Sequence, residues 1–252
     1  MKISVVIPSY NQGRFIRQTI DSILAQEGDI EVFVADGGST DETVEILKSY
    51  GQKIQWVSEK DKGQTDAINK GLSRVTGDIV AYINSDDFYM PGVFNKVREV
   101  FATHPGVMWV TGDALIVDEE GKEIQRGVRF YKRVLRRLPF PWILYITNPI
   151  VQPSTFWRRS LVEEIGLFRQ DKHYTMDYDY WLRIIRYYKP YILVEPLSAF
   201  RIHGLSKGGR QYEKQFQEDW ETVREHCTNP FFLFLHAIHN SLIVGMYRMM
   251  KG

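Results

Sequence analysis

The chain has 252 residues, of which 44% are apolar and 25% charged, and these values exclude a disordered or collagen-like polypeptide. Its net charge of +1 argues against extensive nucleic-acid binding, so no nucleic-acid partner is expected. A chain of this length corresponds to one large domain, or to one domain with an extension, and its core needs no disulfide. Cys227 is the only cysteine, which fits a reducing compartment, and the apolar run that begins at Lys2 is too short for a signal peptide.

The first hundred residues alternate between strand and helix patterns. Short apolar runs predict four buried strands, over Lys2–Ile7, Ile30–Ala35, Ile54–Val57 and Ile79–Ile83. Each is followed by a predicted helix, over Gly13–Ala25, 39–50, Thr65–Val75 and 91–101. Ser39 and Glu42 form an S-x-x-E capping-box pattern at the start of the second helix. Four such repeats predict an α/β fold, with a mostly parallel sheet and helices on both faces.

The pattern changes after His104. Strands are predicted over Val107–Val117 and Glu123–Val128, joined across the polar turn Asp118–Lys122. The segment Arg129–Arg137 then carries five basic residues and no acidic one. The remaining predicted elements are a strand over Ser154–Arg158, a helix to Ile165, a helix over Asp177–Tyr188, a strand over Ile192–Phe200, and helices over Arg210–His226 and Phe231–Tyr247.

Polar residues follow each of the four predicted strands, at the edge where ligands bind in open α/β sheets. These segments read Pro8-Ser9-Tyr10-Asn11, Asp36-Gly37-Gly38-Ser39-Thr40-Asp41, Glu59-Lys60-Asp61-Lys62-Gly63-Gln64 and Asn84-Ser85-Asp86-Asp87. Carboxylates gathered at one edge repel each other unless they are neutralised, and Mg²⁺ or Mn²⁺ neutralises them while accepting hard oxygen ligands. Each segment alone is equally consistent with turn or helix-cap chemistry, and Asp41 is expected to start a helix.

Several segments, taken in order, resemble the family 2 glycosyltransferases of the GT-A fold. They are VVIPSYNQGRFIRQTIDSILAQ, VADGGSTDETVEIL and SEKDKGQTDAINKGLSRVTGDIVAYINSDD, followed by QPSTFWRRSLVEEIGLF, MDYDYWLR and FRIHGLS. The resemblance implies a GT-A domain over residues 1–206, with a Rossmann-like nucleotide-sugar-binding half (about 1–104) and a smaller acceptor-side half (about 105–206). Residues 207–252 are expected to form a C-terminal helical extension.

The resemblance also implies a donor site at the strand ends. Asp36 is expected to bind the base or ribose of the nucleotide, and Pro8, Tyr10 and Asn11 to line the same pocket. The Asp-x-Asp element of the family corresponds to Asn84-Ser85-Asp86, so that an amide replaces the first carboxylate. Such an amide can still form hydrogen bonds with a ribose but adds no charge.

The metal and the donor sugar are assigned to further residues by the same resemblance. Asp86 and His203 are the expected metal ligands, and the ion is expected to be Mg²⁺ or Mn²⁺. The remaining expected substrate-binding residues are Asn84, Ser85, Asp87, Gln64, Asp66 and Asn69. For the last three, helix capping and surface solvation are equally good interpretations.

Asp177 corresponds to the general base of the family, the carboxylate that takes a proton from an acceptor hydroxyl. Met176 stands where the family usually has Glu. Asp179 lies two residues further on and would point away from Asp177 on a helix, so we expect it to cap the helix or form hydrogen bonds at the edge of the core.

The expected activity is metal-dependent, inverting transfer of a sugar from a nucleotide-diphosphate sugar to a glycan or lipid-linked hydroxyl, in cell-surface polysaccharide synthesis. Two alternatives stay open: a metal-dependent nucleotidyltransferase, and a non-catalytic nucleotide-sugar-binding protein of the same fold. No Gly-x-Gly-x-x-Gly or Walker sequence supports a dinucleotide or P-loop site.

Two segments suggest contact with a membrane. Residues 129–147 join the basic run to the aromatic sequence LPFPWILYI, as in an interfacial anchor, although a solvated basic helix beside a buried aromatic segment explains them equally well. Residues 230–250 are apolar but fall short of a membrane span, and packing on the domain or on a partner chain is an alternative. We therefore expect a cytoplasmic protein at the inner face of the cell membrane. A homodimer stays open.

Overall fold

The computed structural model describes residues 1–138, 140–204 and 212–251, with side chains up to residue 246 except that of residue 212. The strands are β1 (Ile3–Ser9), β2 (Ile30–Asp36), β3 (Gln55–Ser58), β4 (Ile79–Tyr82), β5 (Phe88–Tyr89), β6 (Trp109–Val117), β7 (Thr155–Arg158) and β8 (Tyr191–Arg201). The helices are α1 (Gly13–Leu24), α2 (Thr43–Ser49), α3 (Gln64–Leu72), α4 (Val93–Thr103), α5 (Arg126–Leu135), α6 (Trp142–Ile146), α7 (Ser160–Ile165), α8 (Met176–Ile184), α10 (Tyr212–His226) and α11 (Pro230–Lys251). Short 3-10 turns lie at Gly51–Lys53 and Gln152–Ser154.

The strands form one sheet in the order β3-β2-β1-β4-β7-β6-β8-β5. The four strands of the first half pair in parallel, with β1 between β2 and β4 and with β3 outside β2. Strand β7 runs antiparallel to both of its neighbours, β4 and β6, whereas β6 and β8 are parallel. The predicted mostly parallel α/β sheet is confirmed.

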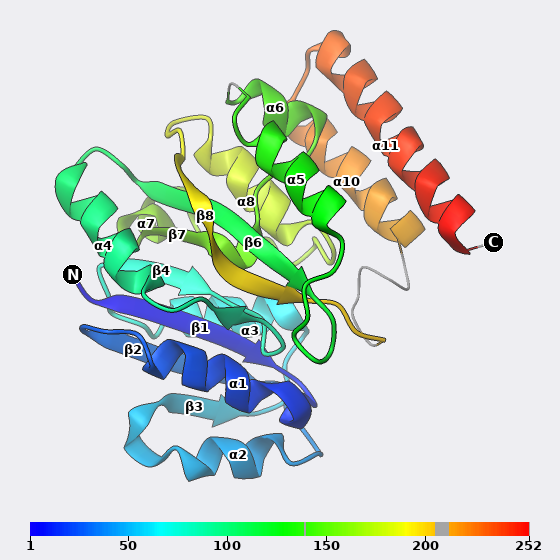
Figure 1. Cartoon of the computed structure of the whole chain (residues 1–252). Helices are drawn as coiled ribbons and strands as arrows, with labels where there is room; N and C mark the ends of the chain where they lie inside the picture. Colours follow the sequence, from blue (N-terminus) through cyan, green and yellow to red (C-terminus); the bar gives the residue numbers. More distant parts are fainter. Residues whose placement is uncertain (139, 205–211, 252) are drawn as a thin grey trace.

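Helices cover both faces of this sheet because its buried strands are apolar on both sides (Figure 1). Successive residues of β1 point to opposite faces, so Val5 and Ile7 join the core beneath α1 and α4, while Val6 joins the core beneath α3 and α8. Gly71 of α3 allows a close approach, since a Cβ at this position would lie 2.3 Å from Val6 Cγ1. The two cores hold the carboxyl ends of β1, β2 and β4 in a fixed register.

The last two described helices form a layer beyond the sheet (Figure 1). Helix α10 packs on α8, and α11 packs on α6 and α10. The expected C-terminal helices are therefore present, but a domain boundary near residue 206 lies outside the described residues and stays a prediction.

The predicted strand over Glu123–Val128 is wrong. The turn after β6 forms as expected, with the backbone N–H of Lys122 donating to Asp118 Oδ1 (2.8 Å), but extended pairing ends with a single bridge between Val117 and Glu123. Helix α5 begins at Arg126 instead. A helix places residues seven apart on one side, which lets the two arginines at positions 129 and 136 reach the same buried carboxylate in β6.

The capping box predicted for α2 is also wrong. Ser39 does not cap the helix, because its hydroxyl donates to Asp36 and accepts from the backbone N–H of Asn11. Glu42 is the N-cap residue and makes no side-chain cap bond, while the preceding Asp41 binds the first residue of each of two helices: its Oδ1 accepts from the backbone N–H of Thr43 (3.0 Å), and its Oδ2 accepts from that of Gly13 (2.9 Å). The prediction that Asp41 starts a helix is confirmed.

Candidate active site

The ends of β1 and β2 are joined by the carboxylate of Asp36. Asp36 lies opposite Ser9 in the sheet and is only 2% exposed. Its Oδ2 accepts from the hydroxyl of Ser58 (2.6 Å) and from the backbone N–H of Ser39 (2.9 Å). Gly38 makes the sharp turn beside it with a φ of +82°, a conformation that favours glycine. The carboxylate therefore shapes the loop after β2, and its contact with a base or ribose stays a prediction.

The other three residues predicted at the end of β1 lie in different environments. Pro8 is buried in the strand, whereas Tyr10 is 60% exposed at the rim. Asn11 has a φ of +51° and accepts a hydrogen bond from the backbone N–H of Thr40 (2.8 Å), which ties this strand end to the loop after β2. The structure thus brings these residues to one edge with Asp36.

Ser9 was not singled out by the sequence. Its hydroxyl is buried at the same edge and has no hydrogen-bond partner among the described residues. Buried hydroxyls are normally paired, so this one is a candidate ligand contact. A serine at the end of an apolar strand is a visible signal, but the amino-acid sequence does not reveal that its hydroxyl lacks a hydrogen-bond partner.

The loop after β4 collects the predicted Asn84–Asp87 element. Gln64, the first residue of α3, donates to Asn84 Oδ1 (2.6 Å), so the third and fourth strand ends meet as expected. Ser85 is buried, and its carbonyl accepts from the hydroxyl of Thr19 in α1 (2.9 Å). These contacts fix the loop but leave substrate binding by Gln64, Asn84 and Ser85 a prediction.

Asp86 and His203 come together from distant parts of the chain. His203 Nε2 lies 2.9 Å from Asp86 Oδ2, and both side chains are largely buried. Two ligands at adjacent positions around an ion with bonds of about 2.1 Å lie about 3 Å apart, so this spacing suits one divalent cation. A carboxylate and an imidazole also suit Mn²⁺ as a donor set. The residues fit the expected metal, although their role as its ligands stays a prediction.

Asp87 lies behind Asp86 and is only 1% exposed. Its Oδ1 accepts from the backbone N–H of Arg201 (2.8 Å), and its Oδ2 accepts from the amide of Asn84 (3.4 Å). Burial raises the pKa of Asp87 well above its usual value, and the charge of Asp86 raises it further. Direct substrate contact by Asp87 stays a prediction; the contacts that it makes here support the loop.

Arg201 holds the loop after β4 against the turn after β6. Its guanidinium donates to the carbonyls of Asp86 and Asp118 and to the amide of Gln18. It also lies 4.8 Å from the ring centroid of Phe15. Its side chain is thus committed to positioning the Asp86 loop.

The two other predicted residues of α3 have separate environments. Asp66 accepts from the backbone N–H of Lys62 (3.1 Å) and borders a pocket of about 210 Å³ that Gln170 also lines. Asn69 is buried, and both polar atoms of its amide bind the backbone of Phe168. Asn69 therefore links α3 to the loop before α8, a role that neither surface solvation nor helix capping describes. Donor contact by either residue stays a prediction.

The first turn of α8 places Asp177 beside the strand ends. The hydroxyl of Thr65 in α3 donates to the sulfur of Met176 (2.8 Å), so the residue that replaces the usual Glu packs between the two helices. Burial raises the pKa of Tyr82 in β4, and the charges of both Asp177 and Asp87 raise it further. Because Thr65 binds Met176 and the preceding Gln64 binds Asn84, the first turn of α8 lies at the edge that holds the Asp86 loop.

Asp177 has the electrostatic environment of a proton acceptor. Burial raises its pKa to about 6, while the backbone N–H of Tyr178 and the charge of Lys132 act in the opposite direction. Lys132 of α5 was not expected here, because the basic run gave no indication of which side of a helix would face the site. The role of Asp177 as general base stays a prediction.

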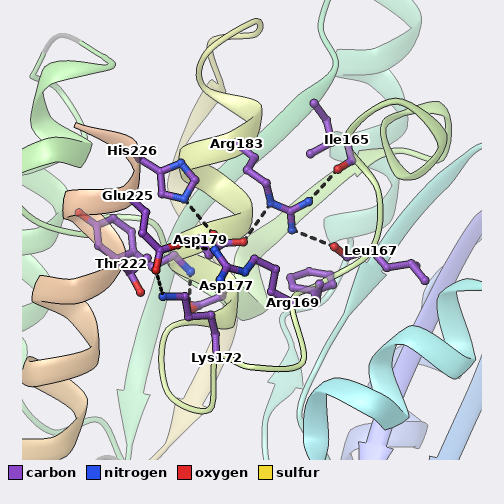
Figure 2. A network of polar contacts seen from close by, with 12 residues as sticks. Ile165, Leu167, Arg169, Lys172, Asp177, Asp179, Arg183, Thr222, Glu225 and His226 are labelled. Atoms are coloured by element: carbon purple, nitrogen blue, oxygen red, sulfur yellow. Dashed lines mark hydrogen bonds and ion pairs between the residues drawn. The ribbon is translucent and has the colours of Figure 1, made fainter. Parts of the chain in front are cut away.

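A network of charges behind Asp177 fixes the orientation of α8 (Figure 2). Asp179 is fully buried and accepts from Arg183 (2.9 Å) and His226 (2.8 Å), as Figure 2 shows. Burial alone would raise the pKa of Asp179. The hydrogen bond from His226 and the charge of Arg183 outweigh this effect and hold the pKa below its usual value. The expectation that Asp179 forms hydrogen bonds at the edge of the core is confirmed.

The carboxylates and imidazole of Asp179, Glu225 and His226 lie close enough to hold a metal ion. Arginine and lysine side chains already neutralise them, however, because Arg183 binds Asp179 and Lys172 binds Glu225 (2.7 Å). This cluster is a structural network that joins α10 to α8 and to the loop before it.

Comparison with known proteins agrees with this geometry. The sequence profile described as Glycosyl transferase family 2 matches residues 4–166. The chain belongs to this family. An uncharacterized glycosyltransferase of Rickettsia typhi is 30% identical over 208 residues, which cover 80% of this chain and 64% of the relative. A PGL/p-HBAD biosynthesis glycosyltransferase of Mycobacterium bovis is 28% identical over a region that covers 71% of this chain and 68% of the relative.

Solved structures of other proteins share the fold. The S. aureus TarS fragment 1–349 in complex with UDP-GlcNAc superposes with a TM-score of 0.67 at 16% identity, over 95% of this chain and 71% of that one. The mannosyltransferase PcManGT of Pyrobaculum calidifontis, in complex with GDP-Man and Mn²⁺, also gives a TM-score of 0.67, at 20% identity over 94% and 68%. The fold of this family 2 chain is therefore of the GT-A type.

Proposed function

We propose that this family 2 chain transfers a sugar from a nucleotide-diphosphate sugar to an acceptor hydroxyl, with inversion at the anomeric carbon. The observation that carries the proposal is the convergence of the Asp86–His203 pair with the first turn of α8, which contains Asp177, at one edge of the sheet. The nucleotide-sugar complexes of TarS and PcManGT, which share the fold, support a donor of this chemical class.

In the proposed mechanism, Asp36 and the end of β1 bind the nucleoside, and Asp86 and His203 would hold a divalent cation. Such an ion, when bound, stabilises the charge that develops on the leaving diphosphate. Asp177 accepts the proton of the acceptor hydroxyl as its oxygen attacks the anomeric carbon. The bond to the diphosphate breaks on the opposite face of the sugar, so no covalent intermediate with the protein is needed.

We further propose that the acceptor is a glycan or lipid-linked hydroxyl, approaching from the side of α5 and α8. The charge of Lys132 in α5 opposes the effect of burial on the pKa of Asp177, which supports an approach along this helix. Helices α5 and α6 contain no acidic residue, which favours an acceptor that carries negative charge.

Product analysis separates this function from the two alternatives. Incubation with UDP- and GDP-sugars, Mn²⁺ and lipid-linked or oligosaccharide acceptors should release nucleoside diphosphate in proportion to the glycoside formed. Release of pyrophosphate would instead indicate a nucleotidyltransferase. Donor binding without turnover on any acceptor would indicate a non-catalytic nucleotide-sugar-binding protein.

A further inference from the structure

Helix α5 turns its charged side toward the protein and an apolar side toward solvent. Arg129 and Arg136 both bind the buried carboxylate of Asp113 in β6, the first at 2.8 Å. On the opposite side, Phe130 and Val134 are 59% and 42% exposed. A helix on the surface of a water-soluble domain normally has the reverse arrangement, with its apolar side toward the core. Helix α5 therefore exposes apolar side chains on the side where a surface helix usually exposes polar ones.

Helices α5, α6 and α11 lie at one end of the molecule (Figure 1), and contacts between their side chains join them. Tyr131 of α5 forms a 2.6 Å hydrogen bond with His239 of α11. Trp142 of α6 stacks on Phe232 of α11, with ring centroids 6.4 Å apart, and Phe231 packs on the same Phe232 ring. Both Trp142 and Phe231 are more than half exposed, so the three helices share one continuous outer surface.

Along α11 the exposed side chains form a stripe at intervals of three and four residues. The stripe consists of Phe231, Phe234, Ile238, Leu242 and Met246. The opposite side of the helix faces α10, where His236 and Asn240 both bind Asp219. The stripe is therefore the side that the domain leaves uncovered. We call the exposed apolar side chains of α5, α6 and α11 the outer face.

The segments that carry the outer face contain basic residues and no acidic one. No acidic residue occurs from Ile124 to Val162, nor after Glu225. Arg126 at the start of α5 pairs with Glu123 (3.0 Å), but Arg133 and Arg137 have no such ion pair among the described residues, and the guanidinium of Arg133 lies 5.5 Å from the ring centroid of Phe130. Arginines that flank an aromatic and aliphatic surface are typical of segments that lie in the interface of an anionic membrane, because the apolar groups enter the acyl region and the guanidinium groups stay with the phosphates.

We propose that the outer face binds the surface of a bilayer that contains anionic lipids, with α5 and α11 lying along it. A second copy of the chain is a poorer occupant, since it would bring two sets of arginines together. In the described part of the chain, no helix is long and apolar enough to cross a membrane, which agrees with binding along the surface. The proposal does not depend on the transferase activity, because it rests on exposed apolar side chains to which no role in donor binding or catalysis is assigned.

Vesicle cosedimentation of the full chain tests the apolar part of this surface. We expect binding to vesicles that contain phosphatidylglycerol, and weaker binding to phosphatidylcholine alone. Leu242→Ser, at a position that is 64% exposed, should weaken this binding about tenfold. Val194→Ser is the matched control: this side chain is 60% exposed in β8, beside Glu195, which pairs with Lys96 of α4, and the variant should bind like the unmodified chain.

A second pair of variants tests the charged part. Arg133→Gln combined with Arg137→Gln should weaken binding to anionic vesicles and reduce its dependence on salt. Lys48→Gln combined with Lys53→Gln removes the same charge from an exposed region at the far edge of the sheet and should have no effect. Asp177→Asn should also bind vesicles normally, which separates this proposal from the proposed catalysis.

Three results would overturn the membrane proposal. The first is an absence of binding to anionic vesicles, and the second is equal binding by Leu242→Ser and Val194→Ser. The third is a dimer in sedimentation velocity that Leu242→Ser dissociates, which would assign the outer face to a second copy of the chain.

Discussion

Asp177 must lose its own proton before it can accept one from an acceptor hydroxyl. Because burial raises its pKa to about 6, we expect kcat to rise with pH through this value and to level off above it. The measurement is kcat against pH at saturating donor and acceptor. A profile that is flat from pH 5 to pH 8 would argue against Asp177 as the base.

Removing the carboxylate should stop turnover without removing the donor site. Asp177→Asn keeps the size of the side chain but cannot take a proton, so we expect kcat to fall by about 10²–10⁴-fold. Donor affinity, measured by calorimetry, should stay close to that of the unmodified chain, because the donor is expected to bind at the strand ends. Full activity in this variant would exclude the assignment.

Lys132 should tune Asp177 from the neighbouring helix. Its positive charge favours the ionised carboxylate, so Lys132→Met should move the acid limb of the kcat profile to higher pH. Arg126→Met is the control, because its side chain is 80% exposed at the start of the same helix and pairs with Glu123. Equal shifts in the two variants would show a general charge effect.

The sequence predicted the residues at the strand ends better than the residues that support them. Asp36 and Asp86 could be selected because they follow predicted strands at the edge where ligands bind, whereas Asp177 was selected through the resemblance to family 2 glycosyltransferases. Lys132 could not be selected, because the basic run that contains it does not indicate which of its residues face the site. Glu218 was equally hidden, because its contacts are with backbone N–H groups more than forty residues away.

Helix α10 supports the start of α8 through Glu218. This carboxylate accepts hydrogen bonds from the backbone N–H groups of His173, Tyr174 and Thr175, and from the hydroxyl of Thr175. It satisfies donors at the positive end of α8, where Asp177 is located. Partial burial raises the pKa of Glu218, but these four hydrogen bonds outweigh that effect and hold the pKa below its usual value.

Glu218→Gln should lower the free energy of unfolding by about 1–3 kcal/mol, since an amide is a weaker acceptor for these groups. The folded-state pKa is lowered, so this stabilisation is present above the usual value of 4.5 and is lost as the pH falls below it. Urea unfolding at pH 7 and at low pH measures both effects. Glu221→Gln on the exposed side of α10 is the control, and an equal loss of stability in it would contradict the assignment.

At the scale of elements, the pattern over Glu123–Val128 predicted a strand where α5 begins. In α5 the side that contacts the domain is charged and the apolar side is exposed. Periodicity identifies which residues share a side of a helix, but it does not reveal whether that side contacts a core or a partner.

The arrangement of the whole sheet was predictable only in part. Four strand–helix repeats indicated the parallel strands β1 to β4 and the edge at which the site lies. The insertion of antiparallel β7 between β4 and β6 depends on contacts between distant segments, such as the hydrogen bond between the hydroxyls of Thr111 and Thr155 (2.9 Å). No local pattern encodes such a pairing.

The central claim is that separate ends of the sheet meet around one cation and the diphosphate of a sugar donor. The most direct measurement is calorimetric titration of UDP and GDP, with Mn²⁺ and with EDTA, into the unmodified chain, Asp86→Asn, and the control Glu99→Gln on α4. We expect one nucleoside diphosphate to bind with Mn²⁺, and its affinity to fall about tenfold or more with EDTA or with Asp86→Asn, but not with Glu99→Gln. Binding that is unchanged by EDTA and by Asp86→Asn would contradict the claim.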